Sequence, residues 1–205
     1  MTVLTGVKAP FELTQYAIAI KQQGIDFVIR HYSHQAGKSL SLAEARALTD
    51  AGLQIGVLWE APEAHLGYYT RAQGCADGAA AYLMAQAVIA QPSGSAIYFA
   101  LPDVAEADGA ASRYVEGVNQ AFRAAAAGER QYKVGVYGSG ACCQALLADG
   151  LASVSWLAAG GERDYTGYSL RQQAGALLPV DDGQRISVSM VSHSPERPAG
   201  LFRVL

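Results

Sequence analysis

The stretch Leu53-Gln-Ile-Gly-Val-Leu-Trp-Glu60 is a largely apolar run that ends on a carboxylate, and Ala61-Pro62 stops it. Such a run, bounded by a turn signal, predicts a buried strand. Burying the charge of Glu60 without a partner would be costly in free energy. We therefore expect Glu60 to lie at the rim of a sheet or barrel, where α/β proteins place their active sites.

Strand-like and helix-like segments alternate along the rest of the chain, which predicts parallel β/α units. The expected strands are Thr2–Val7, Asp26–Tyr32, Leu53–Glu60, Ser95–Leu101, Tyr132–Tyr137, Ser153–Ala158, Ser169–Gln173 and Arg185–Val191. The expected helices are Phe11–Gln23, Ser41–Ala51, Gly74–Ala90, Ala110–Ala127 and Gly140–Ala148.

These units either close as a barrel or stay open as a doubly wound sheet. No Gly-rich phosphate loop follows any expected strand, because Gly138-Ser-Gly140 is too short for a nucleotide fingerprint. The 205 residues are few for a complete barrel, and the last third is poor in helix signal. We predict one domain over residues 1–205, an α/β fold that forms a small TIM-like (β/α)8 barrel with short or missing late helices.

The composition limits the class of partner. A hydrophobic content of 51% with 16% charged residues excludes disorder, and a net charge of -3 gives no reason to expect nucleic acid as a partner. No apolar run is long enough for membrane insertion. The segment Met1–Lys8 lacks the pattern of a signal peptide. We expect a chain that is cytoplasmic as synthesised and is released by lysis or exported by a dedicated secretion system.

Neither a metal nor a cofactor is expected. The cysteines Cys75, Cys142 and Cys143 form no disulfide framework and no zinc spacing. The histidines show only a weak His31-x-x-His34 spacing, so we interpret them as surface or loop residues.

Polar and aromatic side chains gather at the expected carboxyl ends of the strands, which share one face in a parallel barrel. Sugar rings are bound by such sets, because an aromatic face covers their C–H groups while polar side chains meet their hydroxyls. The set consists of Lys8, Arg30, His31, Tyr32, Glu60, Asp103, Tyr137, Trp156 and Gln172.

Each member also has a structural interpretation. Arg30 is either an ion-pair partner of Glu60 or a residue that positions a substrate anion. Tyr137 and Trp156 are equally typical of core aromatics. Glycoside hydrolysis normally needs two carboxylates, and the obvious pair is Glu60 with Asp103.

Several blocks, in order along residues 6 to 190, resemble a bacterial glycoside-hydrolase-like family first classed as a domain of unknown function. That family is similar to the family 25 lysozymes, which are TIM-like barrels that cut the glycan strands of peptidoglycan. The resemblance implies a peptidoglycan-like glycan as ligand and places Tyr98, within one block, in the substrate-binding set. The blocks are Phe27-Val-Ile-Arg-His-Tyr-Ser33, Lys38-Ser-Leu, Glu44-Ala-Arg-Ala-Leu, Gly52–Glu60, Gly74-x-x-Asp77-Gly-x-Ala, Ile97-Tyr-Phe-Ala100 and Lys133-Val-Gly-Val-Tyr-Gly-Ser139.

The departures from the family pattern concern the acids. The family usually has Gly-Phe-Asp at the end of the first strand, where this chain has Gly6-Val7-Lys8. After the fourth strand Leu101-Pro102 intervenes, so Asp103 comes one place late, and Ser187 stands where an acid often follows late in the chain. Lys8 near Glu60 would lower the pKa of Glu60, which disfavours a role as proton donor.

Three hypotheses stay open at this point. The first is a peptidoglycan-directed hydrolase that works with Glu60 and Asp103. The second is a glycan-binding barrel without catalysis, and the third is an interaction scaffold of a phage or secretion system. The fold alone does not decide among them.

Overall fold

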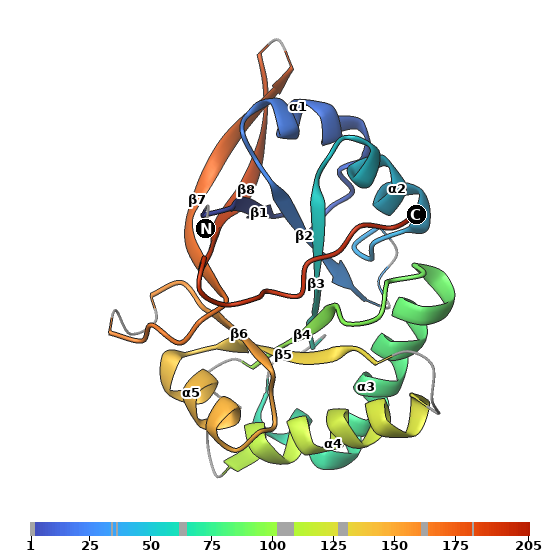
Figure 1. The fold of residues 1–205 in the computed structure, drawn as a ribbon, viewed down its shortest axis with the longest axis vertical. Coiled ribbons are helices and arrows are strands. Elements are labelled where there is room, and N and C mark those ends of the chain that lie inside the picture. The colour runs from blue at the N-terminus through green and yellow to red at the C-terminus, as the bar shows by residue number, and fades with distance from the viewer. Residues whose placement is uncertain are drawn as a thin grey trace.

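The computed structural model describes residues 3–33, 35, 37–61, 65–101, 109–126, 131–160, 164–181 and 183–205. Its strands close into a barrel whose spatial order is the order of the sequence (Figure 1). This confirms the predicted α/β barrel. The strands are β1 (Thr5–Lys8), β2 (Phe27–Tyr32), β3 (Gln54–Trp59), β4 (Ala96–Ala100), β5 (Lys133–Gly138), β6 (Val154–Leu157), β7 (Leu170–Asp181) and β8 (Gln184–His193).

The last strand departs from the pattern of a (β/α)8 barrel. Neighbours from β1 to β7 are parallel, whereas β8 is antiparallel to both β7 and β1. Antiparallel neighbours need no crossover helix. A hairpin that includes Gly183, in a left-handed conformation with φ +81°, therefore joins β7 to β8 directly. This connection accounts for the weak helix signal in the last third of the chain.

The α-helices lie outside the barrel, with α3, α4 and α5 on one side and α1 and α2 on another (Figure 1). Ser41, Thr70 and Ser139 cap α2, α3 and α5 by accepting a hydrogen bond from a backbone N–H of the first turn. As a result α3 begins at Arg71, three residues before the expected helix start at Gly74. The helices are α1 (Ala17–Gln22), α2 (Leu42–Asp50), α3 (Arg71–Leu83), α4 (Ala110–Ala125) and α5 (Gly140–Ala148), with short helices η1 (Thr14–Tyr16), η2 (Leu66–Tyr68) and η3 (Met84–Val88).

Glycines bring α3 and α4 into backbone contact. A Cβ atom on Gly74 would lie 1.9 Å from the carbonyl oxygen of Tyr114, and one on Gly117 would lie 2.1 Å from that of Arg71. Any larger residue would push the helices apart. This contact gives a packing reason for the Gly74 block that carries the family resemblance.

The barrel wall separates two buried layers, because side chains alternate along each strand. The larger layer packs between the strands and the helices. The smaller layer fills the barrel interior and includes Phe27, Ile29, Leu58, Tyr98, Trp156, Leu170 and Val191.

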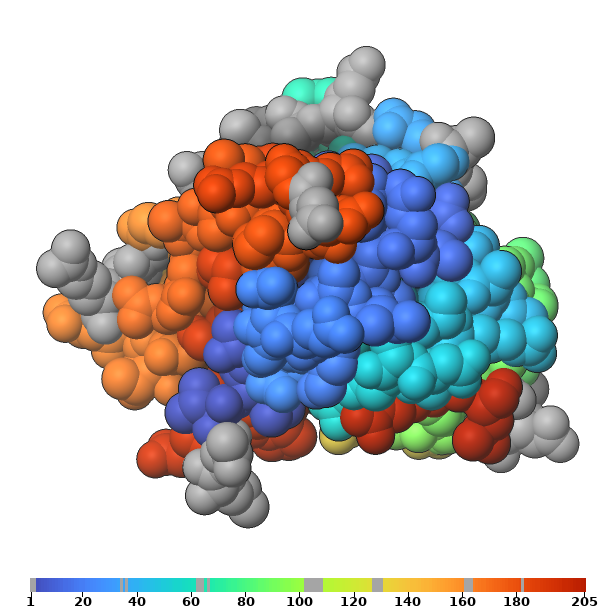
Figure 2. Space-filling model, turned by 90° about the horizontal axis from the view of Figure 1, so that it is seen from above, coloured from blue at the N-terminus to red at the C-terminus, as the bar shows by residue number. Residues whose placement is uncertain are grey.

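The β7–β8 hairpin takes the place of a late helix. Leu178, Ile186 and Val188 of the hairpin join the buried cluster that contains Ala17 and Ile20 of α1. Figure 2 shows the orange-red residues of the hairpin side by side with the blue residues of α1. The hairpin thus covers α1 much as a neighbouring helix would.

The C-terminal segment covers the end of the barrel at which the parallel strands begin. It crosses in front of β3 in Figure 1. Phe202 bridges to Ile55, and the carbonyl of Gly200 accepts a hydrogen bond from the N–H of Ala96 over 2.9 Å. Leu201 packs against the inner cluster. Access to the interior is therefore left to the opposite end, where the carboxyl ends of the parallel strands lie.

Among the residues described, no helix combines the length and the apolar character needed to cross a membrane.

Candidate functional site

Adjacent residues at the carboxyl end of β2 point to opposite sides of the barrel wall. Phe27 and Ile29 belong to the inner cluster, so His31 continues the inward row. Arg30 and Tyr32 point outward, and Tyr32 joins the layer beneath the helices. The interpretation of His31 as a surface or loop residue was wrong, because this side chain is buried on a strand.

Glu60 directly follows β3 and lies beside His31. Lys38 Nζ donates a hydrogen bond to Glu60 Oε2 over 2.8 Å. His31 Nε2 lies 3.5 Å from the same oxygen. The side chains of Glu60 and Lys38 are 38% and 28% exposed, so solvent reaches this pair. Glu60 is thus positioned at the open end of the barrel by a lysine from the segment after β2.

Lys8 ends β1 and points to the same space. Its Nζ atom lies 5.4 Å from the ring centre of Tyr137 and 5.8 Å from that of Trp156, in the geometry of a cation–π interaction. The two rings are 4.6 Å apart and tilted by 59°. Trp156 is fully buried, so Tyr137 presents the ring that a ligand can reach. We call this group the mouth cluster: Lys8, His31, Lys38, Glu60, Tyr137 and Trp156.

The pKa values of the mouth cluster follow from burial and charge. Burial alone would raise the pKa of Glu60, but the hydrogen bond from Lys38 and the neighbouring positive charges lower it overall. Burial lowers the pKa of His31 to about 4 in spite of the attraction of Glu60. At neutral pH Glu60 is therefore ionised and His31 is neutral, so their contact is not an ion pair.

Lys8 and Tyr137 are shifted as well. Burial lowers the pKa of Lys8, the charge of Glu60 opposes this effect, and the charge of Lys38 adds to it. The pKa of Tyr137 is raised by burial and by the charge of Glu60. Tyr137 therefore keeps its hydroxyl proton and can donate a hydrogen bond.

Arg30 does not pair with Glu60. Its Nε donates to Glu44 Oε1 over 2.6 Å and its Nη2 to Glu44 Oε2 over 3.1 Å. Its Nη1 donates to the carbonyl of Ala9 over 2.9 Å. Glu44 Oε1 also accepts a hydrogen bond from the N–H of Leu13. This buried group ties β2 to α2 and to the segment after β1. It corrects both interpretations of Arg30, because the guanidinium neither pairs with Glu60 nor is exposed to a substrate anion.

Two other predicted substrate-binding residues lie away from the mouth cluster. The hydroxyl of Tyr32 donates to Gln91 Oε1 over 2.6 Å beneath the helices. The hydroxyl of Tyr98 donates to the carbonyl of Ala199 over 2.8 Å, toward the C-terminal segment at the closed end. Both side chains are fully buried. They support the barrel from positions that a ligand at the open end does not reach.

Gln172 faces the barrel interior, because it pairs in register with Val191 of the inner cluster. Its Oε1 atom is buried and has no hydrogen-bond partner within the described part of the chain. This amide is therefore available to an additional donor, such as water or a ligand hydroxyl.

Asp103, the predicted second acid, lies outside the described residues. A different acid, Asp77, lines a cavity of about 220 Å³ together with Glu60. Asp77 accepts hydrogen bonds from the hydroxyls of Tyr68 and Tyr114 and from Gln73 Nε2, and its exposed fraction is only 4%. Asp77 thus holds α3, α4 and η2 together and is no free partner for Glu60.

The family is shown by a sequence match. The family described as "Rv2525c-like, glycoside hydrolase-like domain" matches residues 18–177 of this chain. The chain belongs to this family. The resemblance noted in the sequence is thereby confirmed, whereas a search of curated proteins finds no significant match.

Solved structures share the fold at low sequence identity. The Tat-secreted protein Rv2525c of Mycobacterium tuberculosis is 20% identical, with 97% of this chain and 98% of that chain covered and a TM-score of 0.72. The catalytic domain of endolysin Ply40 from bacteriophage P40 of Listeria monocytogenes is 14% identical, with 95% of each chain covered and a TM-score of 0.58. The lysozyme of Streptomyces coelicolor is 12% identical, with coverage of 94% and 93% and a TM-score of 0.57.

Sequence reasoning placed His31 among the strand-end residues but gave it no role in the site, and it gave Lys38 no role either. The alternation of inward and outward residues on β2 could have placed His31 inside the barrel. Lys38 lies between β2 and α2, where no periodic pattern predicts the direction of a side chain.

Within the described ranges, no group of three or more His, Cys, Asp or Glu residues could hold a metal ion.

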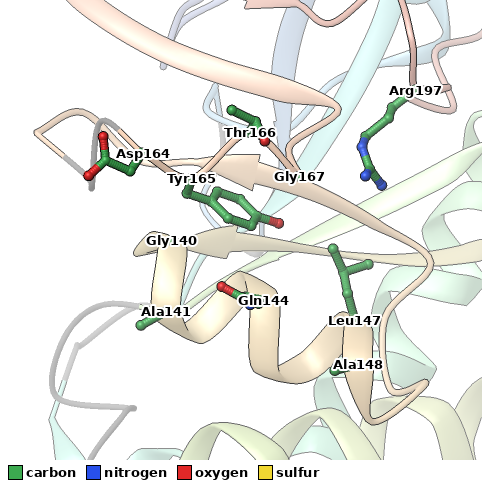
Figure 3. A pocket seen from close by; sticks show the side chains of 10 residues that line it. All are labelled: Gly140, Ala141, Gln144, Leu147, Ala148, Asp164, Tyr165, Thr166, Gly167 and Arg197. Atoms are coloured by element: carbon green, nitrogen blue, oxygen red, sulfur yellow. The ribbon is translucent and has the colours of Figure 1, made fainter.

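A larger cavity of about 750 Å³ lies outside the barrel, between one face of α5 and residues 164–167 (Figure 3). Gln144 and Leu147 reach toward it from α5, and Arg197 reaches in from the opposite side. The hydroxyl of Tyr165 is already hydrogen bonded to Ser155. None of the predicted site residues lines this cavity, so the mouth cluster remains the candidate site.

Proposed function

We propose that this protein binds the glycan of the bacterial cell wall at the mouth cluster, with Glu60 accepting hydrogen bonds from sugar hydroxyls. The observation that carries the proposal is the ionised, solvent-reached Glu60, fixed by Lys38 over 2.8 Å at the open end of the barrel. Lysozymes and an endolysin share this fold, which supports a glycan as the ligand.

The aromatic part of the mouth cluster supports the same ligand. The half-buried Tyr137 ring leans on the buried Trp156 ring, which fixes its orientation. A fixed aromatic face stacks on the C–H groups of a sugar ring, and the Tyr137 hydroxyl adds a donor. A carboxylate, an aromatic face and a hydroxyl donor together suit a polyhydroxylated ring.

Hydrolysis is a second candidate, because Glu60 stands at the end of β3 in a fold shared with lysozymes. The usual mechanism needs a proton donor and a second carboxylate. The lowered pKa of Glu60 suits a base or nucleophile and not a proton donor. Hydrolysis therefore requires a second acid, for which Asp103 is the candidate.

The route by which this protein reaches the bacterial cell wall, either release by lysis or export by a dedicated secretion system, also stays a prediction.

One experiment tests both candidates. Purified protein is sedimented with insoluble peptidoglycan, and new reducing ends are measured in the same samples. We expect co-sedimentation of the wild type and at least about tenfold weaker binding for Glu60→Gln, since one charge-assisted hydrogen bond contributes about 1.5–3 kcal/mol. Glu116→Gln is the matched control, because it removes another partly exposed carboxylate, which lies near Arg71 on the outer helices.

The outcomes separate the candidates. Reducing ends that require both Glu60 and Asp103, the latter tested as Asp103→Asn, would establish hydrolysis. Binding without reducing ends supports recognition alone. Absence of co-sedimentation at any protein concentration would overturn the proposed function.

A further inference from the structure

Lys8 differs from the other lysine of the mouth cluster. Lys38 is ion-paired with Glu60. For Lys8, within the described part of the chain, there is no carboxylate at ion-pair distance and no hydrogen-bond acceptor, and the faces of Tyr137 and Trp156 are its polar contacts. A largely buried ammonium group without an acceptor is a group whose hydrogen bonds remain to be made.

The charge balance of the mouth cluster also favours an anion. Lys38 and Glu60 neutralise each other at 2.8 Å. His31 is neutral at pH 7, because burial lowers its pKa. Among the described residues the charge of Lys8 is therefore left over, which gives the mouth cluster one net positive charge.

We propose that the mouth cluster selects sugars that carry a carboxylate, and that Lys8 binds this carboxylate. The inference rests on the proposed function, because it specifies which glycans the site accepts. A sugar held against the exposed part of Tyr137 would bring a substituent within reach of Lys8 Nζ, which lies over that ring, 5.4 Å from its centre. The paired Glu60 remains available to the hydroxyls of the same sugar.

Unpartnered polar atoms in the barrel interior support an incoming polar ligand. Trp156 Nε1 and His31 Nδ1 are buried and have no hydrogen-bond partner among the described residues. Natural proteins leave few such groups unsatisfied, and water or ligand atoms usually satisfy them. Both side chains belong to the mouth cluster, so their unsatisfied atoms suit a polar partner that enters beside Lys8 and Glu60.

Burial strengthens the expected contact. A partly desolvated ammonium group interacts with a carboxylate more strongly than a fully hydrated one does, and the hydrogen bond is charge-assisted. Burial lowers the pKa of Lys8, and a bound carboxylate opposes this effect by favouring the charged amine. Binding of an acidic sugar and protonation of Lys8 therefore support each other.

The carboxylate has two sources, the lactyl group of muramic acid that carries no stem peptide and the C6 carboxylate of a uronic acid. The probes are a disaccharide of N-acetylglucosamine and N-acetylmuramic acid, the same disaccharide with its lactyl carboxylate converted to a methylamide, a disaccharide of N-acetylglucosamine and glucuronic acid, and neutral chitobiose. Affinity is measured by calorimetry at low and high salt. The amide differs from the acid only in the charged group, so this pair isolates the contribution of the carboxylate.

We expect the wild type to bind the free acid about tenfold more tightly than the amide, and the preference to shrink in high salt. Lys8→Met keeps the length of the side chain and should reduce the preference to less than about twofold, which is close to no selective charge contact. Lys8→Arg keeps the charge and should retain the preference. Lys133→Met, which removes a lysine at the start of β5 and thus at the closed end, is the control and should leave it unchanged.

Thermal unfolding of each variant verifies that it is folded before binding is interpreted. Tighter binding of the muramic or of the glucuronic disaccharide identifies the source of the carboxylate. Equal affinity for acid and amide, with both bound, would overturn the selectivity and leave the proposed function standing. Failure of the wild type to bind any of the four probes, together with failure to co-sediment with peptidoglycan, would overturn the proposed function itself.

Discussion

The molecule contains two carboxylate–cation pairs on opposite sides of β2, one formed by Arg30 and the other beside His31, and they behave in opposite ways. Outside the barrel, Arg30 and Glu44 form a two-bond pair whose side chains are 0% and 1% exposed. Inside the mouth, Lys38 and Glu60 form a single bond at 28% and 38% exposure, next to His31. The first pair joins elements of the fold, and the second faces solvent at the open end.

The difference shows how the alternation of a strand assigns roles. Arg30 and His31 are consecutive, yet one reaches a helix and the other reaches the mouth cluster. A fully buried pair with every hydrogen bond made is expensive to break, whereas a pair at an open rim can exchange its partner for a ligand. Burial, more than residue type, therefore separates the structural carboxylate from the candidate functional one.

The largest effect is expected for Glu44→Gln, which leaves the charge of Arg30 buried without a carboxylate. The free energy of unfolding should fall by about 3–5 kcal/mol. For a domain of this size the melting temperature should fall by roughly 6–20 °C. Urea unfolding and thermal unfolding measure both values. A loss below about 1 kcal/mol, the range of an exposed pair, would contradict the structural role of Arg30 and Glu44.

The second effect concerns pH and His31. The pKa of His31 is about 4 in the folded protein and 6.5 in the unfolded chain, so the unfolded chain binds more protons between these values. Stability therefore falls with acidification, by about 2 kcal/mol between pH 7 and pH 5. Urea unfolding at the two pH values should show this loss in the wild type and a smaller one in His31→Gln. Glu60 stays ionised in this window, because its pKa is lowered from 4.5.

His193 is the comparator for this measurement, because burial lowers its pKa in the same direction. His193→Gln should remove a smaller part of the loss, since this side chain is less buried than His31. An unchanged pH dependence in His31→Gln would show that His31 is not held neutral by burial.

A smaller effect on stability is expected for Glu60→Gln. Solvent screens this 38% exposed side chain, so the free energy of unfolding should change by less than about 1 kcal/mol. The same change should weaken glycan binding, as proposed above. Urea unfolding and peptidoglycan sedimentation on the same preparation separate the two properties. A large loss of stability would show that Glu60, like Glu44, mainly stabilises the fold.

The smallest effect is expected for Lys38→Met, which removes the hydrogen bond that lowers the pKa of Glu60. The pKa of Glu60 should rise, because burial, which favours the neutral acid, is then opposed without the hydrogen bond and the charge of Lys38. A carboxyl-detected NMR titration measures the shift. Lys21→Met is the control, since Lys21 lies 3.5 Å from Asp26 and not near Glu60.

The barrel was predictable because strand and helix periods alternate along the chain and no nucleotide-binding loop is present. The reversed direction of β8 was not. A short alternating strand has the same pattern in either direction, so nothing in Arg185–Val191 reveals that β8 pairs antiparallel with β1. The length of β7 was also underestimated, because Ala174-Gly-Ala176 carries little strand preference.

The site was predictable to the extent that it depends on strand ends. Lys8, Glu60, Tyr137 and Trp156 converge because parallel strands end on one face. Arg30 and Tyr32 do not join them, because nearness to a strand end does not tell whether a side chain points into the barrel or out toward the helices. Tyr98 faces inward but lies toward the closed end. The position of a residue along the barrel axis depends on the stagger of neighbouring strands, which the sequence pattern does not give.

The antiparallel seam between β1 and β8 joins Thr5 to Ser192, and the C-terminal segment then pairs Phe202 with Ile55. Contacts between residues so far apart in sequence form late, because a long loop must close before they contribute any stability. Until residues 189–202 arrive, β1 keeps an unpaired edge and the interior stays open at its base. Unpaired edges of this kind are sites of aggregation. Correct closure of this barrel therefore depends on how fast residues 189–202 pair with β1 and β3, compared with the rate at which the unpaired edge of β1 aggregates.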